Sequence, residues 1–182
     1  MTRIKYIASV VIVLCVVFLA SGAILKIMYP SLYTDIIVEN AELYQMDPLF
    51  ILSIIRAESN FNASAVSTKN AKGLMQLKPE TAYWCAQNMG YTDYTEDKLF
   101  EPETNIRLGV WYLSYLQEQF DGDKILATAA YNAGIGNVKK WLKDPKCSAN
   151  GKSLDKVPFR ETDKYIKKVF NNYAIYKMLR RS

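Results

Sequence analysis

The sequence has 182 residues, a length that fits one folded domain or one domain with an anchor and excludes two full-sized domains. Half of the residues are hydrophobic and 13% are aromatic, which excludes a disordered tail or a fibrous repeat. The sequence contains no histidine, so catalytic schemes that need an imidazole and histidine-based zinc sites are excluded as well. Any chemistry must therefore use carboxylate, hydroxyl, amide, amine or thiol groups.

The net charge of +5 is unevenly distributed along the chain. Residues 27–138 carry 7 basic and 14 acidic side chains, whereas residues 139–182 carry 13 basic and 4 acidic ones. A basic end is typical of nucleic-acid binding, of binding to an anionic surface, or simply of solvated helix faces. Because the sequence has no nucleic-acid-binding motif, we expect no nucleic-acid partner.

The N-terminal region contains an uncharged apolar run over residues 7–25. A helix of that length spans about 28 Å, close to the hydrocarbon thickness of a bilayer. Basic side chains precede the run, which predicts a single-pass anchor with a cytoplasmic N-terminus and an extracytoplasmic domain. Cleavage near Ala23, which would give a secreted form, is the alternative. We expect the signal anchor to occupy residues 1–27 and the folded domain residues 28–182.

The first predicted helices of the domain begin at acidic residues followed by proline. Asp47 is a favourable N-cap, and Pro48 is tolerated in the first helical turn. Glu101 and Pro102 repeat this signal, and apolar residues at helical spacing follow them until the break at Gly122.

Two further helices are predicted in the last third of the chain. One runs from Lys124 to Asn132 and is closed by Gly134. The other aligns aromatic and aliphatic residues on one stripe, namely Tyr165, Val169, Tyr173 and Tyr176. Because no convincing period-two strand pattern appears, the sequence predicts an all-α domain of about six or seven helices.

Two cysteines, Cys85 and Cys147, lie in the predicted extracytoplasmic domain. A disulfide is possible in that compartment, and two separate buried thiols are the alternative. The sequence leaves both open, because a disulfide requires a specific geometry.

Glu58 is the strongest candidate for a chemical role. The helix beginning at Pro48 places it on the same face as Ile51, Ile54 and Ile55, so it ends an apolar stripe. Burial disfavours the charged form of a carboxyl group and raises its pKa, as a general acid requires. The alternative is a structural carboxylate that caps a backbone group or pairs with a nearby basic side chain.

Four sequence motifs then resemble a known family. In chain order they are Ala57-Glu58-Ser59-Asn60-Phe61-Asn62, Gly73-Leu74-Met75-Gln76-Leu77, Ala129-Ala130-Tyr131-Asn132-Ala133-Gly134 and Glu161-Thr162-Asp163-Lys164-Tyr165. Together they resemble the lytic transglycosylases of the soluble-lytic (SLT) type, a branch of the lysozyme-like superfamily. The resemblance runs from about Leu32 to Tyr176.

The resemblance implies a single lysozyme-like (goose-type/SLT) helical domain behind the N-terminal transmembrane helix. It also implies that Glu58 is the only catalytic acid/base, that peptidoglycan glycan strands are the substrate, and that no metal or cofactor is needed. The substrate-binding residues implied are Ser67, Met75, Gln76, Tyr131, Asn132 and Tyr165. Ala63 and Asn70 depart from the usual pattern of the family, and Asn70 is still compatible with a left-handed turn.

The polar candidates each have a structural alternative. The amide of Gln76 suits an acetamido group of the substrate but could instead pin the loop. Asn132 could cap its own helix end, and Ser67 could bond only to the neighbouring backbone.

The apolar and aromatic candidates also have alternatives. Tyr131 offers a ring for sugar stacking and a hydroxyl near the reacting carboxyl, or else it is a core tyrosine. Met75 is more typical of a pocket wall than of a chemical group. Tyr165 either closes the site from the last helix or is a core aromatic residue.

The resemblance implies a reaction that consumes no water. Glu58 would protonate the bond between N-acetylmuramic acid and N-acetylglucosamine and then deprotonate the muramoyl C6 hydroxyl, giving a 1,6-anhydro product. Ordinary glycosidases need a second carboxylate, for which Glu161 is the only candidate in the motifs. The alternatives are a hydrolytic muramidase on the same fold and an inactive wall-binding or scaffold protein.

Overall fold

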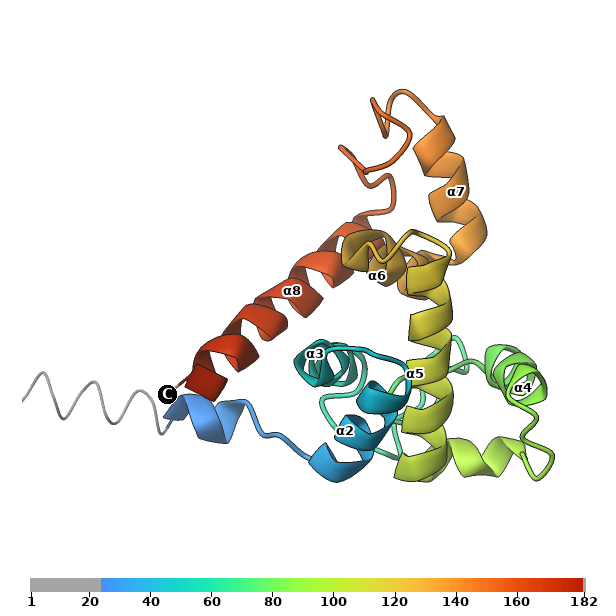
Figure 1. Ribbon diagram of the computed structural model, residues 1–182, viewed down its shortest axis with the longest axis vertical. Coiled ribbons are helices and arrows are strands. Elements are labelled where there is room, and N and C mark those ends of the chain that lie inside the picture. Colours follow the sequence, from blue (N-terminus) through green and yellow to red (C-terminus); the bar gives the residue numbers. More distant parts are fainter. Residues whose placement is uncertain (1–23, 182) are drawn as a thin grey trace, which may run out of the picture.

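A computed structural model describes residues 24–181 of the chain (Figure 1). Its named elements are Thr34–Leu43 (α2), Pro48–Glu58 (α3), Pro79–Asn88 (α4), Glu96–Phe100 (the 3₁₀ helix η1), Pro102–Glu118 (α5), Lys124–Ala133 (α6), Ile135–Lys143 (α7) and Arg160–Arg181 (α8). Within the described residues there is no extended strand, and β-type pairing is limited to isolated bridges in the segment 66–77. The prediction of an all-α domain is confirmed for this part of the chain.

Local sequence signals explain where several helices begin. The side chain of Asp47 accepts a hydrogen bond from the backbone N–H of Leu49, and Pro48 is the first residue of α3. Asp123 caps α6 in the same way by accepting from two backbone N–H groups of the first turn. Each cap satisfies donors that have no partner inside the helix, which typically stabilises a helix by about 1 kcal/mol.

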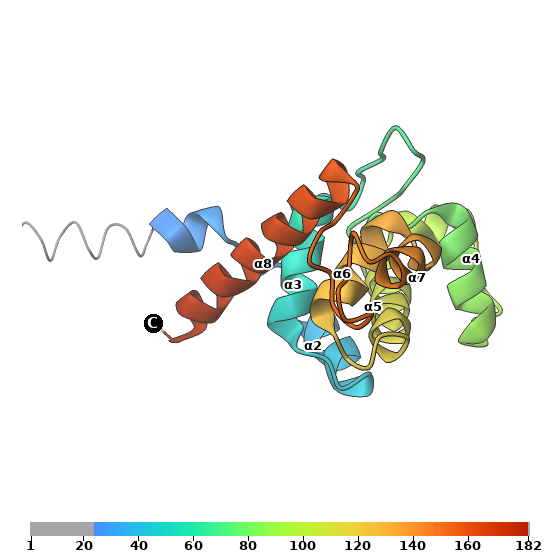
Figure 2. The ribbon, with the colours of Figure 1, turned by 90° about the horizontal axis from the view of Figure 1, so that it is seen from above.

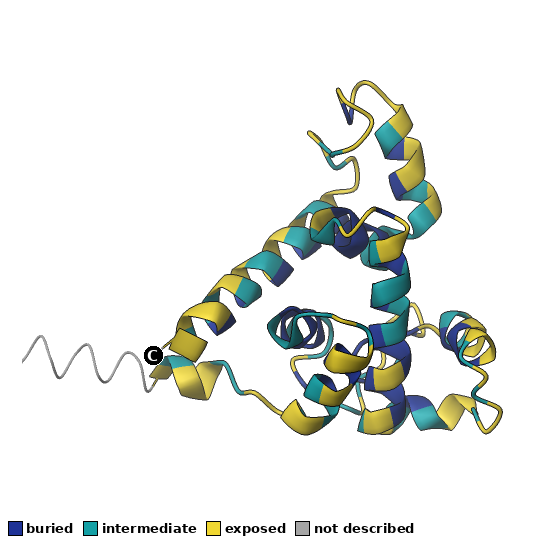
Figure 3. Cartoon of the chain, viewed as in Figure 1, coloured by how far each residue is buried: buried dark blue, intermediate teal, exposed yellow. Residues whose placement is uncertain are grey.

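Helix α3 forms the centre of the main core and packs against α2 and α8 (Figures 1 and 2). Its apolar side chains Phe50, Ile51, Ile54 and Ile55 are fully buried. Figure 3 shows that the burial of α8 is one-sided, with buried residues facing α3 and exposed residues facing away. Val169 and Tyr176 lie on this buried stripe, as the sequence predicts, whereas Tyr173 is only half-buried.

The two cysteines of the domain are buried in different apolar clusters. Cys85 lies on α4 and packs with residues of η1 and α5, whereas Cys147 follows α7 and packs with residues of α5, α6 and α7. Both thiols are free in the structure. The arrangement is therefore the alternative of two separate buried thiols rather than a disulfide.

The predicted anchor lies largely outside the described residues, because the structure describes only the last two positions of the apolar run 7–25. Between residues 24 and 181, none of the helices combines the length and the apolar character needed to cross a bilayer. The segment that follows the run is fixed to the end of α8, because the hydroxyl of Tyr176 donates to the carbonyl of Pro30 at 3.0 Å.

Candidate active site

Glu58 is the last residue of α3, at the point where the apolar stripe of the helix reaches a cavity. Its side chain is half-buried, and its Oε1 accepts a hydrogen bond of 2.6 Å from the hydroxyl of Tyr165. Burial raises the pKa of Glu58 from 4.5 to about 7, although the Tyr165 hydrogen bond and the nearby charge of Lys168 act in the opposite direction. A carboxyl group with this pKa exchanges its proton readily near neutral pH.

The cavity beside Glu58 has a volume of about 400 Å³. It lies between the loop 59–78, the first turn of α4, the middle of α5, the end of α6 and the start of α8. Four of the predicted substrate-binding residues line it together with Glu58, namely Ser67, Gln76, Tyr131 and Asn132. The structure therefore brings together residues that are far apart in the sequence.

The loop 59–78 forms one wall of the cavity and has an unusual backbone. Positive φ angles occur at Asn60, Phe61, Asn70, Gly73 and Gln76. The angle of 60° at Asn70 agrees with the expectation that asparagine preserves the left-handed turn. At Gly73 a Cβ atom would lie 2.1 Å from the carbonyl oxygen of Leu99, so both the backbone angle and the close approach require glycine.

Asn105 on α5 fixes this loop, a role that no sequence motif indicated. Its side chain is completely buried. The Nδ2 group donates to the carbonyls of Lys72 and Leu99, and Oδ1 accepts from the backbone N–H of Met75 at 2.7 Å. A buried asparagine with three backbone partners holds the loop in place. Its sequence context, two residues after Glu103 in a predicted helix, does not indicate this role.

Met75 does not line the cavity, which corrects the expectation that it forms part of the pocket wall. Its side chain is fully buried and packs against Gly109 of α5, where a Cβ atom would lie 2.3 Å from the Met75 sulfur. The turn at Gly73 directs the side chain into the core, while the backbone of Met75 remains near the site. Its carbonyl oxygen accepts a hydrogen bond of 2.8 Å from the hydroxyl of Tyr131.

Two of the lining residues also hold the loop in place. The Nε2 group of Gln76 donates to the carbonyls of Ala65 and Gly73. Its amide nitrogen therefore fixes the loop, as in the structural alternative considered for this residue. The Oγ atom of Ser67 accepts from the backbone N–H groups of Lys69 and Ala71, which is the local bonding considered for it. Both residues still line the cavity.

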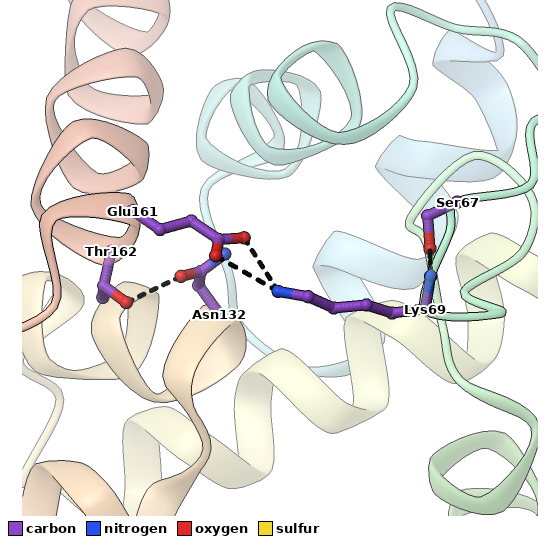
Figure 4. A network of polar contacts seen from close by, with 5 residues as sticks. All are labelled: Ser67, Lys69, Asn132, Glu161 and Thr162. Carbon is purple, nitrogen blue, oxygen red and sulfur yellow. Dashed lines mark hydrogen bonds and ion pairs between the residues drawn. The ribbon is translucent and has the colours of Figure 1, made fainter.

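The other side of the cavity is formed by α6 and the start of α8. The Oδ1 atom of Asn132 accepts a hydrogen bond of 2.8 Å from the Thr162 hydroxyl, which joins the two helices (Figure 4). Glu161 points toward Lys69 of the opposite loop, and their ion pair has an N–O distance of 3.1 Å (Figure 4). Both side chains are about two-thirds exposed, so the pair contributes little to stability.

Two tyrosines, Tyr131 and Tyr165, interact electrostatically with Glu58. Burial and the neighbouring Glu58 raise the pKa of both phenols well above the ordinary value, so both remain protonated. Tyr165 is buried in the main core and reaches Glu58 from α8, but it does not line the cavity, so it has features of both roles considered for it. Tyr131 is half-buried and lines the cavity.

The site thus contains one carboxyl group, that of Glu58, whose pKa suits proton transfer. It accepts a hydrogen bond from Tyr165 and lies near amide and hydroxyl groups. The second carboxylate of the cavity, Glu161, is exposed and paired with Lys69. In the described part of the chain, no three side chains of the metal-ligating acidic or thiol types come close enough to hold a metal ion. The chemistry available from these residues is acid–base chemistry on a polar ligand.

Comparison with known proteins agrees with this geometry. The transglycosylase SLT domain family matches residues 35–153. The soluble lytic murein transglycosylase of Salmonella typhimurium is 35% identical over 151 residues, which are 82% of this chain and 23% of that protein. The membrane-bound lytic murein transglycosylase C of Edwardsiella ictaluri is 31% identical over 176 residues, covering 81% of this chain and 47% of that protein.

A solved structure is also similar over most of the chain. An inactive mutant of lytic transglycosylase Slt from Pseudomonas aeruginosa superposes with a TM-score of 0.76 at 36% identity and covers 85% of this chain. This chain spans only about a quarter of the length of that protein and of the Salmonella relative.

Proposed function

This chain belongs to the transglycosylase SLT domain family, and we propose that it is a lytic transglycosylase that cleaves peptidoglycan glycan strands. The observation that carries the proposal is the Glu58 carboxyl group, whose pKa of about 7 and hydrogen bond to Tyr165 suit a group that gives and later takes one proton. The relatives that are named lytic murein transglycosylases support the substrate class.

In the first step, the protonated Glu58 donates to the oxygen that links C1 of N-acetylmuramic acid to N-acetylglucosamine. The C1–O bond breaks, the N-acetylglucosamine side leaves with a free hydroxyl, and positive charge develops at C1. With Oε1 held by Tyr165, the proton is carried by Oε2. The hydroxyl of Tyr131 donates its proton to the carbonyl of Met75. The lone pairs of the Tyr131 oxygen are therefore available to stabilise the positive charge at C1.

In the second step, Glu58 acts as the base. Its carboxylate takes the proton of the muramoyl C6 hydroxyl, and the C6 oxygen bonds to C1. The product ends in a 1,6-anhydro ring, no water is consumed, and Glu58 is protonated again for the next cycle. One carboxyl group is sufficient because the substrate supplies the nucleophile.

The main alternative is a muramidase in which water attacks C1. An inverting hydrolase needs a second carboxylate as a base for that water, and a retaining one needs it as a nucleophile. Glu161 is the only other carboxylate that lines the cavity formed by the described residues, and it is exposed and paired with Lys69. Both of its oxygen atoms accept from Lys69, so the geometry favours the reaction without water.

A wall-binding protein without activity is the second alternative. A protein that only binds has no need for a half-buried carboxyl group at the end of an apolar stripe, because the loss of hydration is costly to the folded state. The raised pKa of Glu58 therefore favours catalysis over binding alone.

We also propose that the residues 7–25 anchor the protein in the membrane and that residues 28–182 act outside the cytoplasm. The apolar run supports this location, as does the similarity to a relative that is named membrane-bound. Tyr29 packs edge-on against Tyr176 with ring centroids 5.6 Å apart, so the chain leaving the anchor is attached to the C-terminal end of α8. The cavity lies at the other end of that helix.

The test is the release of soluble fragments from purified peptidoglycan by the full-length protein in detergent. We expect the wild type to release fragments and Glu58→Gln to release none above background. Glu161→Gln is the matched control, since it removes the other carboxylate of the cavity and should retain the reaction. Loss of activity in Glu161→Gln but not in Glu58→Gln would contradict the assignment.

A further inference from the structure

A continuous series of aromatic rings leads away from the cavity along α4 and α5. It begins with Tyr131 and Tyr112, which both line the cavity and have ring centroids 5.5 Å apart. Tyr112 in turn lies 6.3 Å from the ring of Trp84 on α4. Of the rings in this series, the mechanism proposed above uses only Tyr131, so the others have no role in it.

Trp84 is the centre of an aromatic cluster at the outer end of this series. Its ring centroid is 5.3 Å from Trp111 and 5.0 Å from Tyr115, both on α5. Trp111 and Tyr115 are themselves stacked, with an interplanar angle of 9°. Trp84 remains 36% exposed, so the cluster (Trp84, Trp111 and Tyr115) is partly open to solvent.

Helical geometry places this cluster next to the cavity rather than on a remote surface. Thr81 lines the cavity and precedes Trp84 by three residues on α4, and Tyr112 lines the cavity and precedes Tyr115 by three residues on α5. Residues three apart on a helix share a face. Helix α4 packs beside α5 (Figure 1). The cluster therefore continues the cavity wall in one direction.

The chemistry of the cluster fits a sugar ring. Pyranose rings present C–H groups on their faces, and these pack against aromatic faces, while the sugar hydroxyl groups stay hydrated. A tryptophan that is neither fully buried nor isolated provides such a face, and no charged residue belongs to the cluster. The exposed Asn88, four residues after Trp84 on α4, donates its Nδ2 group to the Trp84 carbonyl, and its side-chain oxygen adds an acceptor on the same helix face.

We propose that Trp84, supported by Trp111 and Tyr115, is a distal saccharide subsite that holds the glycan strand beyond the sugars bound in the cavity. This inference rests on the proposed function, because its ligand is the same strand whose bond lies at Glu58. The consequence is a preference for long strands: a sugar on Trp84 adds affinity only when the strand extends past the cavity.

The experiment compares the full-length wild type with Trp84→Ala and Trp84→Phe on two substrates. The first substrate is long, uncrosslinked glycan strands, and the second is a fragment of two disaccharide repeats. We expect Trp84→Ala to lower kcat/KM on the long strands by about tenfold, through KM, and to leave the short fragment unchanged. Trp84→Phe retains an aromatic face and should recover most of the loss.

Tyr83→Ala is the matched control. Tyr83 is the neighbouring residue on α4, is 57% exposed, and lines a different hollow with Tyr94. It should behave like the wild type on both substrates. Equal losses on both substrates in Trp84→Ala would mean a structural effect and would overturn the proposal, as would the absence of any loss on the long strands.

A binding measurement separates this inference from the proposed function. If the wild type cleaves neither substrate, the proposed function fails, and tryptophan fluorescence titration with the same long strands and short fragment still tests the subsite. Tighter binding of the long strands that is lost in Trp84→Ala supports the subsite. Equal binding of both ligands by the wild type, or unchanged binding by the variant, refutes it.

Discussion

Removing the ionisable group of Glu58 should make the protein more stable at neutral and alkaline pH. In the folded protein, burial raises the Glu58 pKa from 4.5 to about 7, so the folded state holds this proton more tightly than the unfolded state does. Between these two pKa values the folded state binds more protons, and its stability therefore falls as the pH rises. Above both pKa values the ionised Glu58 destabilises the folded state by the full amount, and a pKa shift of this size corresponds to about 3 kcal/mol.

Glutamine has nearly the same shape and no charge, so Glu58→Gln avoids this cost. Its side-chain oxygen can still accept the hydrogen bond from Tyr165. We expect the variant to equal the wild type in stability near pH 4.5 and to exceed it by about 2 to 3 kcal/mol at pH 8, with the difference growing through the interval between.

The assay is urea unfolding followed by circular dichroism at about pH 4.5, 6 and 8, with the full-length proteins in the same detergent. Glu161→Gln is the control, because it makes the same chemical change at an exposed position. A Glu58→Gln gain that is the same at pH 4.5 and pH 8 would refute the reasoning, as would a wild type that is the more stable protein at pH 8.

The remaining predictions concern the groups around Glu58 and the loop. Tyr165→Phe removes the hydrogen bond that lowers the Glu58 pKa, so the pKa should rise further and the alkaline limb of the pH–rate profile should move to higher pH; a shift to lower pH would contradict this. Asn105→Ala removes three hydrogen bonds and leaves the buried Met75 N–H and Leu99 carbonyl without that partner; it should lower the free energy of unfolding by about 3 kcal/mol or more, with a loss under about 1 kcal/mol as the contrary result. Lys69→Ala removes an exposed ion pair and should change the free energy of unfolding by less than about 1 kcal/mol, so a larger loss in the same urea experiment would show that the pair is structural.

The parts of the fold that depend on local signals could be predicted from the sequence. Asp47 and Pro48 begin α3, and Pro102 begins α5, because N-caps and first-turn prolines act within a few residues. The apolar stripe of α3 likewise placed Glu58 at the edge of the core. The end of α5 was less well predicted: the helix stops at Glu118, before the expected break at Gly122, because the chain turns over residues 119–122 and the N–H of Gly122 bonds back to the carbonyl of Gln117.

The parts of the site that depend on the approach of distant segments could not be predicted in this way. Met75 was expected in the cavity, but its side chain enters the space left by Gly109 on α5, which is 34 positions away in the sequence. Asn105 has an unremarkable sequence context, and only the folded loop reveals its three backbone partners. The Lys69–Glu161 pair joins residues 92 positions apart.

The most direct test of the central claim is mass spectrometry of the glycan fragments released in water enriched in ¹⁸O. If Glu58 acts alone as acid and then base, the fragments end in 1,6-anhydromuramic acid, weigh one water less than reducing-end fragments, and contain no ¹⁸O at C1. The Glu58→Gln protein should give none of them. Reducing-end fragments that carry ¹⁸O at C1 would contradict the account, because water and not the C6 hydroxyl would then be the nucleophile.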